Sequence, residues 1–169
     1  MANLKIEIKW AFIFTIVGLL WMLLEKQVGL HDKYLDFQMY LTNLFAIPAI
    51  FVMVMALRDK KKNYFNGNMN YKQGFISGLL LSVFISILSP ISQRITSYII
   101  TPDYFNNAIK RSVEIQYYKT IEEAEAYFNF QNYVIQGLFG ALVMGIVTTS
   151  IIMIFLRSKN KYFYLAGCF

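Results

Sequence analysis

Long runs of apolar residues, separated by short segments rich in charged and polar residues, dominate the chain. A helix of about 20 residues crosses about 30 Å of hydrocarbon, because each residue adds about 1.5 Å of length. Four of the apolar runs reach this length, at residues 8–26, 37–57, 74–98 and 133–156. The pattern predicts an all-α fold, an integral membrane four-helix bundle that forms a single membrane domain over residues 1–169.

Breaks in the apolar pattern predict where the helices bend or end. Pro48 lies near the middle of the second run, and we expect a kink there because proline removes a backbone hydrogen bond. Asn66 and Gly67 favour a tight turn between the second and third spans. Pro102 continues a helix poorly, so a new segment is expected to begin near Thr101.

Residues 103–132, between the third and fourth spans, are predicted to form an extracytoplasmic helical cap. Its first part, residues 103–119, has the pattern of an amphipathic helix, because apolar residues recur there every four positions. These residues are Phe105, Ile109, Val113 and Tyr117. Thr120, with Glu123 three residues later, has the spacing of a capping box, and the helix that it opens is expected to continue into the last span.

The composition agrees with a membrane protein and excludes several kinds of site. Hydrophobic residues make up 57% of the chain and charged residues only 15%, which exceeds what the core of a soluble domain requires. The single cysteine, Cys168, excludes a disulfide framework and a cysteine-cluster metal site. The single histidine, His31, is expected at a surface or an interface rather than as a metal ligand. We therefore predict neither a metal nor a cofactor.

Lysine and arginine are unevenly distributed between the connecting segments. The N-terminal segment, the loop of residues 58–72 and the tail after Leu156 together hold 10 of the 16 basic residues and 2 of the 10 acidic residues. Since short loops rich in Lys and Arg stay in the cytoplasm, we expect both termini to be cytoplasmic. The formal charge of +6 is thereby assigned to topology, and no nucleic-acid partner is expected.

Small residues form a stripe in each of the third and fourth spans. At four-residue intervals the stripes consist of Gly74, Gly78, Ser82 and Ser86 in the third span and of Gly137, Ala141, Gly145 and Thr149 in the fourth. Membrane helices associate through close backbone approach, for which such stripes are suited. We expect these two spans to pack on each other, or one of them to form a homodimer contact.

Polar residues of the spans concentrate in their predicted outer halves. We interpret them as the lining of an outward-facing polar vestibule for a ligand or a partner. The residues are Glu25, Gln38, Asn43, Gln93, Arg94, Glu125, Asn129, Asn132 and Gln136. A charged side chain near hydrocarbon is costly, so Arg94 is expected either to reach the lipid headgroups or to pair with an acidic residue such as Glu25.

Motifs for enzyme chemistry do not occur in the sequence. It holds no GxSxG, phosphate-binding loop or paired-histidine helix, and no ionisable residue lies at the predicted midplane of a span. The pattern favours a non-enzymatic accessory or interaction subunit, embedded in the lipid bilayer and contacting a membrane-protein partner or a second copy. Two alternatives remain: an oligomeric transporter or pore, and a membrane enzyme that acts on lipid-linked substrates through Arg94 with Glu25 or Glu125.

Four segments carry a resemblance to a known family. They read LLEKQVGLHDKY, IPAIFVMVMALRDKKKN, NYKQGFISGLLLS and IITPDYFNNAI. Together they resemble a family of small inner-membrane proteins from the Bacteroidota that is described only as a domain of unknown function. The resemblance covers nearly the whole chain and implies a four-helix protein of the bacterial inner (cytoplasmic) membrane. It assigns no catalytic or binding residue, because the motifs consist of glycine, proline and aromatic positions.

Overall fold

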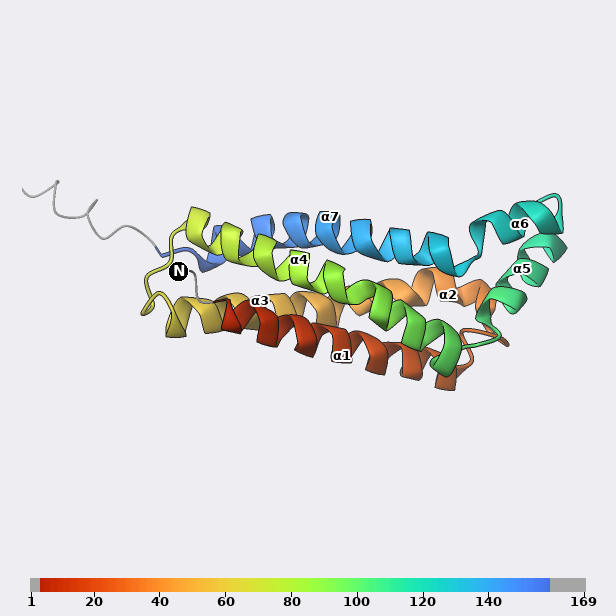
Figure 1. Cartoon of the computed structure of the whole chain (residues 1–169), viewed down its shortest axis with the longest axis horizontal. Coiled ribbons are helices and arrows are strands. Elements are labelled where there is room, and N and C mark those ends of the chain that lie inside the picture. The colour runs from red at the N-terminus through yellow and green to blue at the C-terminus, as the bar shows by residue number, and fades with distance from the viewer. Residues whose placement is uncertain (1–3, 159–169) are drawn as a thin grey trace, which may run out of the picture.

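A computed structural model describes residues 4–158, and all regular structure in this range is helical (Figure 1). The α-helices are α1 (Lys5–Val28), α2 (Leu35–Leu41), α3 (Ala46–Asn63), α4 (Tyr71–Ile95), α5 (Tyr104–Glu114), α6 (Ile121–Tyr127) and α7 (Phe130–Leu156). A 3-10 turn, Thr42–Phe45, joins α2 to α3, and a wider π turn, Thr96–Ile100, extends α4. The predicted all-α class is confirmed, whereas Cys168 lies outside the described residues.

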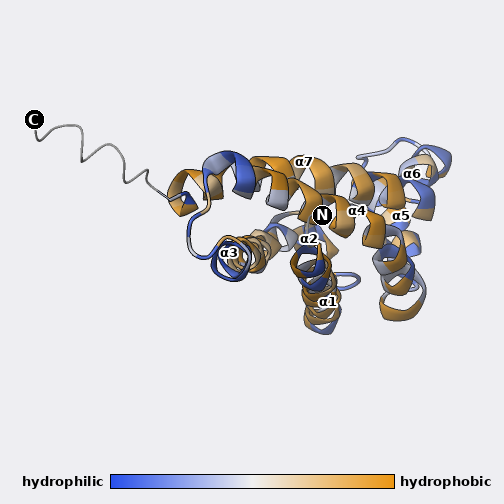
Figure 2. Ribbon diagram, turned by 60° about the vertical axis from the view of Figure 1, so that its left-hand side comes forward, coloured by the Kyte–Doolittle hydropathy of each residue, from blue (hydrophilic) through white to orange (hydrophobic). Residues whose placement is uncertain are grey.

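Four helical stretches within residues 4–158 are long and apolar enough to cross a membrane. They are Lys5–Val28, Leu35–Asn63, Tyr71–Ile100 and Ile121–Leu156, which agrees with the number of predicted spans. Their outward-facing side chains are largely apolar, and Phe155 on α7 is 81% exposed. Figure 2 shows hydrophobic residues along most of the long helices and hydrophilic residues at the end of α3 and in α6. Surfaces of this kind require lipid rather than water.

The second stretch is irregular just before its proline. Pro48 is the third residue of α3, and the 3-10 turn Thr42–Phe45 directly precedes that helix. Proline cannot donate a hydrogen bond to the carbonyl of Leu44 and its ring crowds that carbonyl, so the backbone tightens in this turn. The second stretch is therefore divided at this turn, and the predicted kink at Pro48 stays a prediction.

Helices α4 and α7 run side by side and bring their small residues together (Figure 1). Gly78 faces Thr149, Gly145 faces Ser82, and Ser86 Oγ donates a hydrogen bond to the Leu138 carbonyl at 2.9 Å. The absence of side chains at the glycines lets the two backbones approach closely, which is the main source of attraction between helices in lipid. The structure thus places the two stripes against each other within one chain.

The two ends of this helical body differ. One end, here called the basic end, holds the start of α1, the loop of residues 64–70 and the end of α7. The packed core lies toward this end and consists of Ala11, Met53, Ala56, Leu57, Met69, Leu81, Ile85, Ile152 and Met153. In the loop, Asn66 and Gly67 have φ of 50° and 84°, as the predicted tight turn requires.

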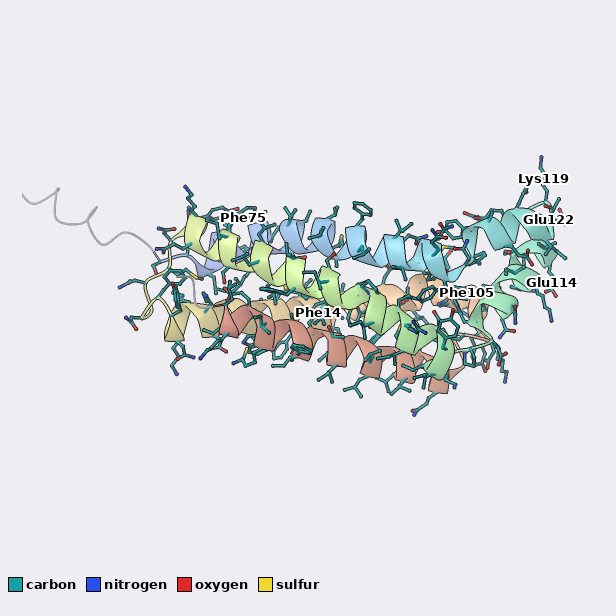
Figure 3. The ribbon with its side chains drawn as sticks, in the orientation of Figure 1. Phe14, Phe75, Phe105, Glu114, Lys119 and Glu122 are labelled. Atoms are coloured by element: carbon teal, nitrogen blue, oxygen red, sulfur yellow. The ribbon has the colours of Figure 1, made fainter. Side chains whose placement is uncertain are left out.

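At the opposite end, here called the cap end, α5 and α6 project beyond the long helices α1, α4 and α7 (Figure 1). Glu114, Lys119 and Glu122 lie at the tip of this cap, far from Phe14 in the helical body (Figure 3). The amphipathic helix ends at Glu114 instead of Lys119, and Gln116 then turns the chain with φ of 57°.

Helix α6 has the predicted start but not the predicted length. Thr120 Oγ1 accepts the Glu123 N–H at 3.2 Å, as a capping residue does. The helix ends at Tyr127, however, and Asn129 starts α7 as a new N-cap. The expected unbroken helix from residue 120 into the last span is therefore wrong. An Asn side chain that bonds the N3 backbone N–H favours a helix start over a helix interior.

The glycines of the α4–α7 contact yield a test of the packing. A Cβ added at Gly78 would collide with the Thr149 side chain, whose Cβ lies 2.9 Å from it, whereas one added at Gly140 would meet no atom within 4 Å. We expect Gly78→Ala to destabilise the protein by roughly 1–3 kcal/mol through overpacking. Gly140→Ala should be neutral or stabilise the helix by up to about 1 kcal/mol. Unfolding in mixed micelles measures both, and equal effects would contradict the packing.

Candidate functional site

Glu25, which was one alternative partner for Arg94, binds His31. Glu25 Oε2 lies 3.0 Å from His31 Nε2, and Trp21 Nε1 donates a hydrogen bond to Glu25 Oε1 at 2.6 Å. A carboxylate only accepts hydrogen bonds, so this contact requires a proton on His31 Nε2. The Glu25 side chain is 2% exposed and that of His31 is 5% exposed. Of the two expected places for His31, a surface or an interface, the surface is excluded, because His31 is buried between segments of the chain.

The end of α1 explains why these two residues meet. Gly29 adopts the left-handed conformation, with φ of 84°, immediately after α1. The N–H of Gly29 donates to the Lys26 carbonyl and that of Leu30 to the Glu25 carbonyl, at 2.9 and 3.0 Å. These two hydrogen bonds define a Schellman motif, which reverses the chain sharply at a helix C-terminus. The reversal returns His31 to the side chain of Glu25.

Around His31 a set of polar side chains, here called the cap junction, joins five segments. Besides Glu25 and His31 it consists of Gln38, Tyr104, Asn107 and Tyr133. Tyr104 donates to Gln38 Oε1 at 3.1 Å, and its hydroxyl lies 3.0 Å from that of Tyr133. Asn107 Nδ2 donates to the His31 carbonyl at 3.1 Å. Of the predicted vestibule residues, the structure brings Glu25 and Gln38 to this junction.

Burial determines the protonation state of the Tyr104 hydroxyl, which lies at the centre of the cap junction. Loss of hydration raises the pKa of Tyr104, because burial disfavours the charged phenolate. Tyr104 therefore remains a neutral hydrogen-bond donor at physiological pH. Its ring also packs edge-on against His31, with the ring centroids 5.4 Å apart. These contacts hold α5 against α2 and α7 and set the position of the cap.

A second contact holds the cap from its water side. Arg111 on α5 binds Asp36 on α2 through two hydrogen bonds, Nε to Oδ1 at 2.8 Å and Nη2 to Oδ2 at 2.6 Å. Hydrogen bonding to Asp36 raises the pKa of Arg111, so the guanidinium stays charged. Both side chains are exposed, so the pair contributes little to stability. Its two hydrogen bonds instead orient α5 relative to α2.

The remaining vestibule residues do not converge. Arg94 is exposed, and no described residue forms a hydrogen bond or an ion pair with it. Gln93 Nε2 donates to Ser97 Oγ at 2.9 Å, and Asn43 Nδ2 donates to the Met39 carbonyl at 2.7 Å, each within its own helical stretch. Gln136 and Glu125 are exposed.

The side chains of Asn129 and Asn132 form hydrogen bonds with the backbone at the break between α6 and α7. Asn129 Oδ1 accepts the Asn132 N–H at 2.9 Å, and the two amide groups donate to carbonyls at the end of α6. Side-chain amides thus satisfy backbone groups that a helix end leaves unpaired. Because the helix is interrupted here, the predicted vestibule residues Glu125, Asn129, Asn132 and Gln136 do not lie on one continuous helix.

A second buried polar cluster, at the basic end, was missed by the sequence analysis. Glu7 on α1 is 3% exposed, and its Oε1 lies 2.8 Å from Lys60 Nζ on α3 and 2.6 Å from the donating Ser77 Oγ on α4. The Lys60 ammonium also lies 4.0 Å from the centroid of the Tyr64 ring. Glu7 lies just before the first predicted span, which begins at residue 8, and was therefore not considered as a buried residue.

A signal for this cluster exists in the spacing of α1. Glu7 and Glu25 are 18 residues apart, which is five turns of about 3.6 residues, so both carboxylates lie on one face. The residues between them on that face are Ala11, Phe14, Gly18 and Trp21. Within residues 4–158 no group of three or more His, Cys, Asp or Glu side chains is arranged to hold a metal ion. Both carboxylates instead connect segments of the protein.

Comparison with known families gives one result. The family model DUF4199, described as a protein of unknown function, matches residues 9–158. The chain belongs to this family. No curated protein and no solved structure gives a significant match. The four segments that suggested a family of unknown function all lie within the matched residues of DUF4199, and this part of the resemblance is confirmed. The Bacteroidota source stays a prediction.

Double-mutant cycles distinguish the observed Glu25–His31 pair of this DUF4199 protein from the alternative pair of Glu25 with Arg94. Glu25→Gln and His31→Ala should interact by roughly 1–3 kcal/mol, because the two residues share one buried contact. Glu25→Gln and Arg94→Leu should be additive within about 0.5 kcal/mol, since the side chains share none. Reversible unfolding in mixed micelles measures all variants. Additivity of the first pair together with coupling of the second would refute the assignment.

Proposed function

We propose that this protein is a non-enzymatic interaction subunit of the bacterial inner membrane and that α5 and α6 form its contact surface. The observation that carries the proposal is the projection of these two helices beyond the long helices α1, α4 and α7 (Figure 1). Large apolar side chains are exposed on α6 and on the segment between α5 and α6. Ile115, Tyr117, Ile121 and Tyr127 are between 43% and 68% exposed. Apolar side chains gathered outside the membrane and surrounded by polar ones mark a protein-binding surface.

The charge around this surface indicates the kind of partner. Glu122, Glu123 and Glu125 lie beside the apolar tip, and none of the described residues forms a salt bridge with them. Residues 103–132 hold five acidic and three basic side chains, although the whole chain has a formal charge of +6. Complementary charge steers partners together and selects among them. The partner is therefore a protein with a basic, water-exposed segment next to the membrane.

The cap is held firmly enough to present such a surface. The cap junction and the Arg111–Asp36 pair fix α5 against α2 and α7, so a partner would meet an ordered helix pair. A pre-ordered surface loses less conformational entropy on binding. The buried carboxylates, by contrast, are occupied by internal partners, which argues against a catalytic role for Glu25. The polar vestibule forms no part of the proposal, because its residues do not converge.

Photo-cross-linking in intact cells tests this surface. Benzoylphenylalanine at position 117 should form an adduct with a second protein, and the cross-linked peptide should contain Lys or Arg residues. Replacing Glu122, Glu123 and Glu125 by Gln should reduce the adduct roughly tenfold, because the charge attraction is removed. The same probe at position 139, exposed on α7 within the fourth apolar stretch, is the control. Adducts of twice the chain mass alone, or adducts that ignore the Gln changes, would refute the proposal.

The orientation that belongs to this proposal has both termini and the loop of residues 58–72 in the cytoplasm and the cap outside, as the lysine and arginine distribution indicates. In a Cys168→Ser background, Lys119→Cys should react with a membrane-impermeant maleimide in intact cells. Asn68→Cys should react only after the membrane is permeabilised. Both positions are exposed, so accessibility within the protein does not limit labelling. The opposite labelling pattern would reverse the orientation.

A further inference from the structure

At the basic end, α3 and α7 enclose a hollow that combines cations with apolar side chains. It is lined by Arg58, Lys61, Lys62, Gly67, Phe155 and Leu156. The two helices meet here because Lys61 Nζ donates a hydrogen bond to the Leu156 carbonyl at 2.8 Å. We propose that this hollow binds the phosphate headgroup of an anionic phospholipid, with an acyl chain along α7. The proposal concerns the end opposite the cap and is independent of the partner role.

The cations of the hollow have no acidic partner among the described residues. Arg58, Lys61 and Lys62 have the spacing of neighbours on the last turns of α3, since residues three and four apart share a helix face. Glu7, the nearby buried acid, binds Lys60, and Asp59 on the same turn binds Lys9 and Trp10 Nε1. The acids of this end are thus neutralised elsewhere, and a concentration of positive charge remains in the hollow.

The floor of the hollow is formed by an ordered loop. Gly67 N–H donates to the Lys61 carbonyl at 2.8 Å, and Ser158 Oγ donates to the Gly67 carbonyl at 3.1 Å. Ser158 N–H in turn donates to the Met69 carbonyl at 2.8 Å. These bonds join the turn after α3 to the end of α7, so the cations lie beside a fixed backbone rather than on a free chain.

An apolar path leads from the cations toward the middle of the body. On α7, Phe155, Ile151 and Val147 follow one another at four-residue intervals and are 81%, 54% and 48% exposed. On α3, Phe51 lies two turns before Arg58 and is also exposed. A phosphate group needs cations, and an acyl chain needs an apolar surface that continues from them into the hydrocarbon. A phospholipid satisfies both, whereas inorganic phosphate would leave Phe155 unused.

Native mass spectrometry of the full chain in detergent tests the site. Dioleoylphosphatidylglycerol should bind in preference to dioleoylphosphatidylcholine, which has the same chains and no net charge. Arg58→Gln combined with Lys62→Gln should weaken phosphatidylglycerol binding roughly tenfold or more, as expected when two cations are removed. Lys33→Gln combined with Lys110→Gln removes the same charge from exposed positions at the cap end and should change binding little. Circular dichroism checks that each variant retains its helix content.

A second pair of variants separates a lipid from free phosphate. Phe155→Ser should weaken phosphatidylglycerol binding severalfold through lost apolar contact, whereas Phe139→Ser, also on an exposed face of α7, should not. Inorganic phosphate at millimolar concentration should fail to displace the lipid. Three results would each overturn the proposal: equal binding of the two lipids, equal loss in both double variants, or displacement by phosphate with no effect of Phe155→Ser.

Discussion

Two buried carboxylates on one helix, Glu7 and Glu25, set the arrangement of the other segments. A carboxylate removed from water must have a cation or several hydrogen-bond donors, because its desolvation costs several kcal/mol or about 20 kcal/mol in the idealised limit. Glu7 meets this requirement with Lys60 and Ser77, and Glu25 with His31 and Trp21. The two pairs therefore fix that helix at both ends and leave its middle to packing.

The middle of the body is held by a different force. In lipid there is no hydrophobic drive for helices to associate, so contact area and close backbone approach must supply the attraction. The small residues of α4 and α7 provide this approach, most closely where Gly78 faces Thr149 and Gly145 faces Ser82. Breaking a buried ion pair costs about 3–5 kcal/mol, which is more than one glycine contact contributes. The polar ends thus determine which helices meet, and the small residues determine how closely.

The sequence predicted the features that depend on long periodic patterns. Four apolar stretches, the all-α class, the turn at Asn66 and Gly67 and the start of α6 at Thr120 follow from local composition and spacing. The break at Asn129 was missed, because the helix that starts at Thr120 was assumed to continue into the last span. Asn129 is a strong N-cap residue, and its spacing to Asn132 could have indicated a new helix.

Contacts between side chains that are far apart in the sequence were harder to predict. Lys60 follows Glu7 by 53 residues, and no local rule joins them. Glu25 was considered as an alternative partner of Arg94 on grounds of predicted depth alone. The depth of a residue in the membrane does not show which way its side chain points. The Schellman turn at Gly29 does give a direction, because it returns the chain onto the last turn of α1 and so toward Glu25. Reading helix ends before assigning charge pairs would have favoured His31.

The internal pairs also decide which charges remain for other molecules. At the basic end Lys60 and Lys9 neutralise Glu7 and Asp59, so the surplus that remains in the last turns of α3 is positive. At the cap end Arg111 is engaged by Asp36 and Glu114, and the surplus beside the apolar tip is negative. The same contacts that stabilise the body therefore separate the free charge into two surfaces of opposite sign. One lies beside exposed apolar residues that suit a lipid chain, and the other beside aromatic residues that suit a protein.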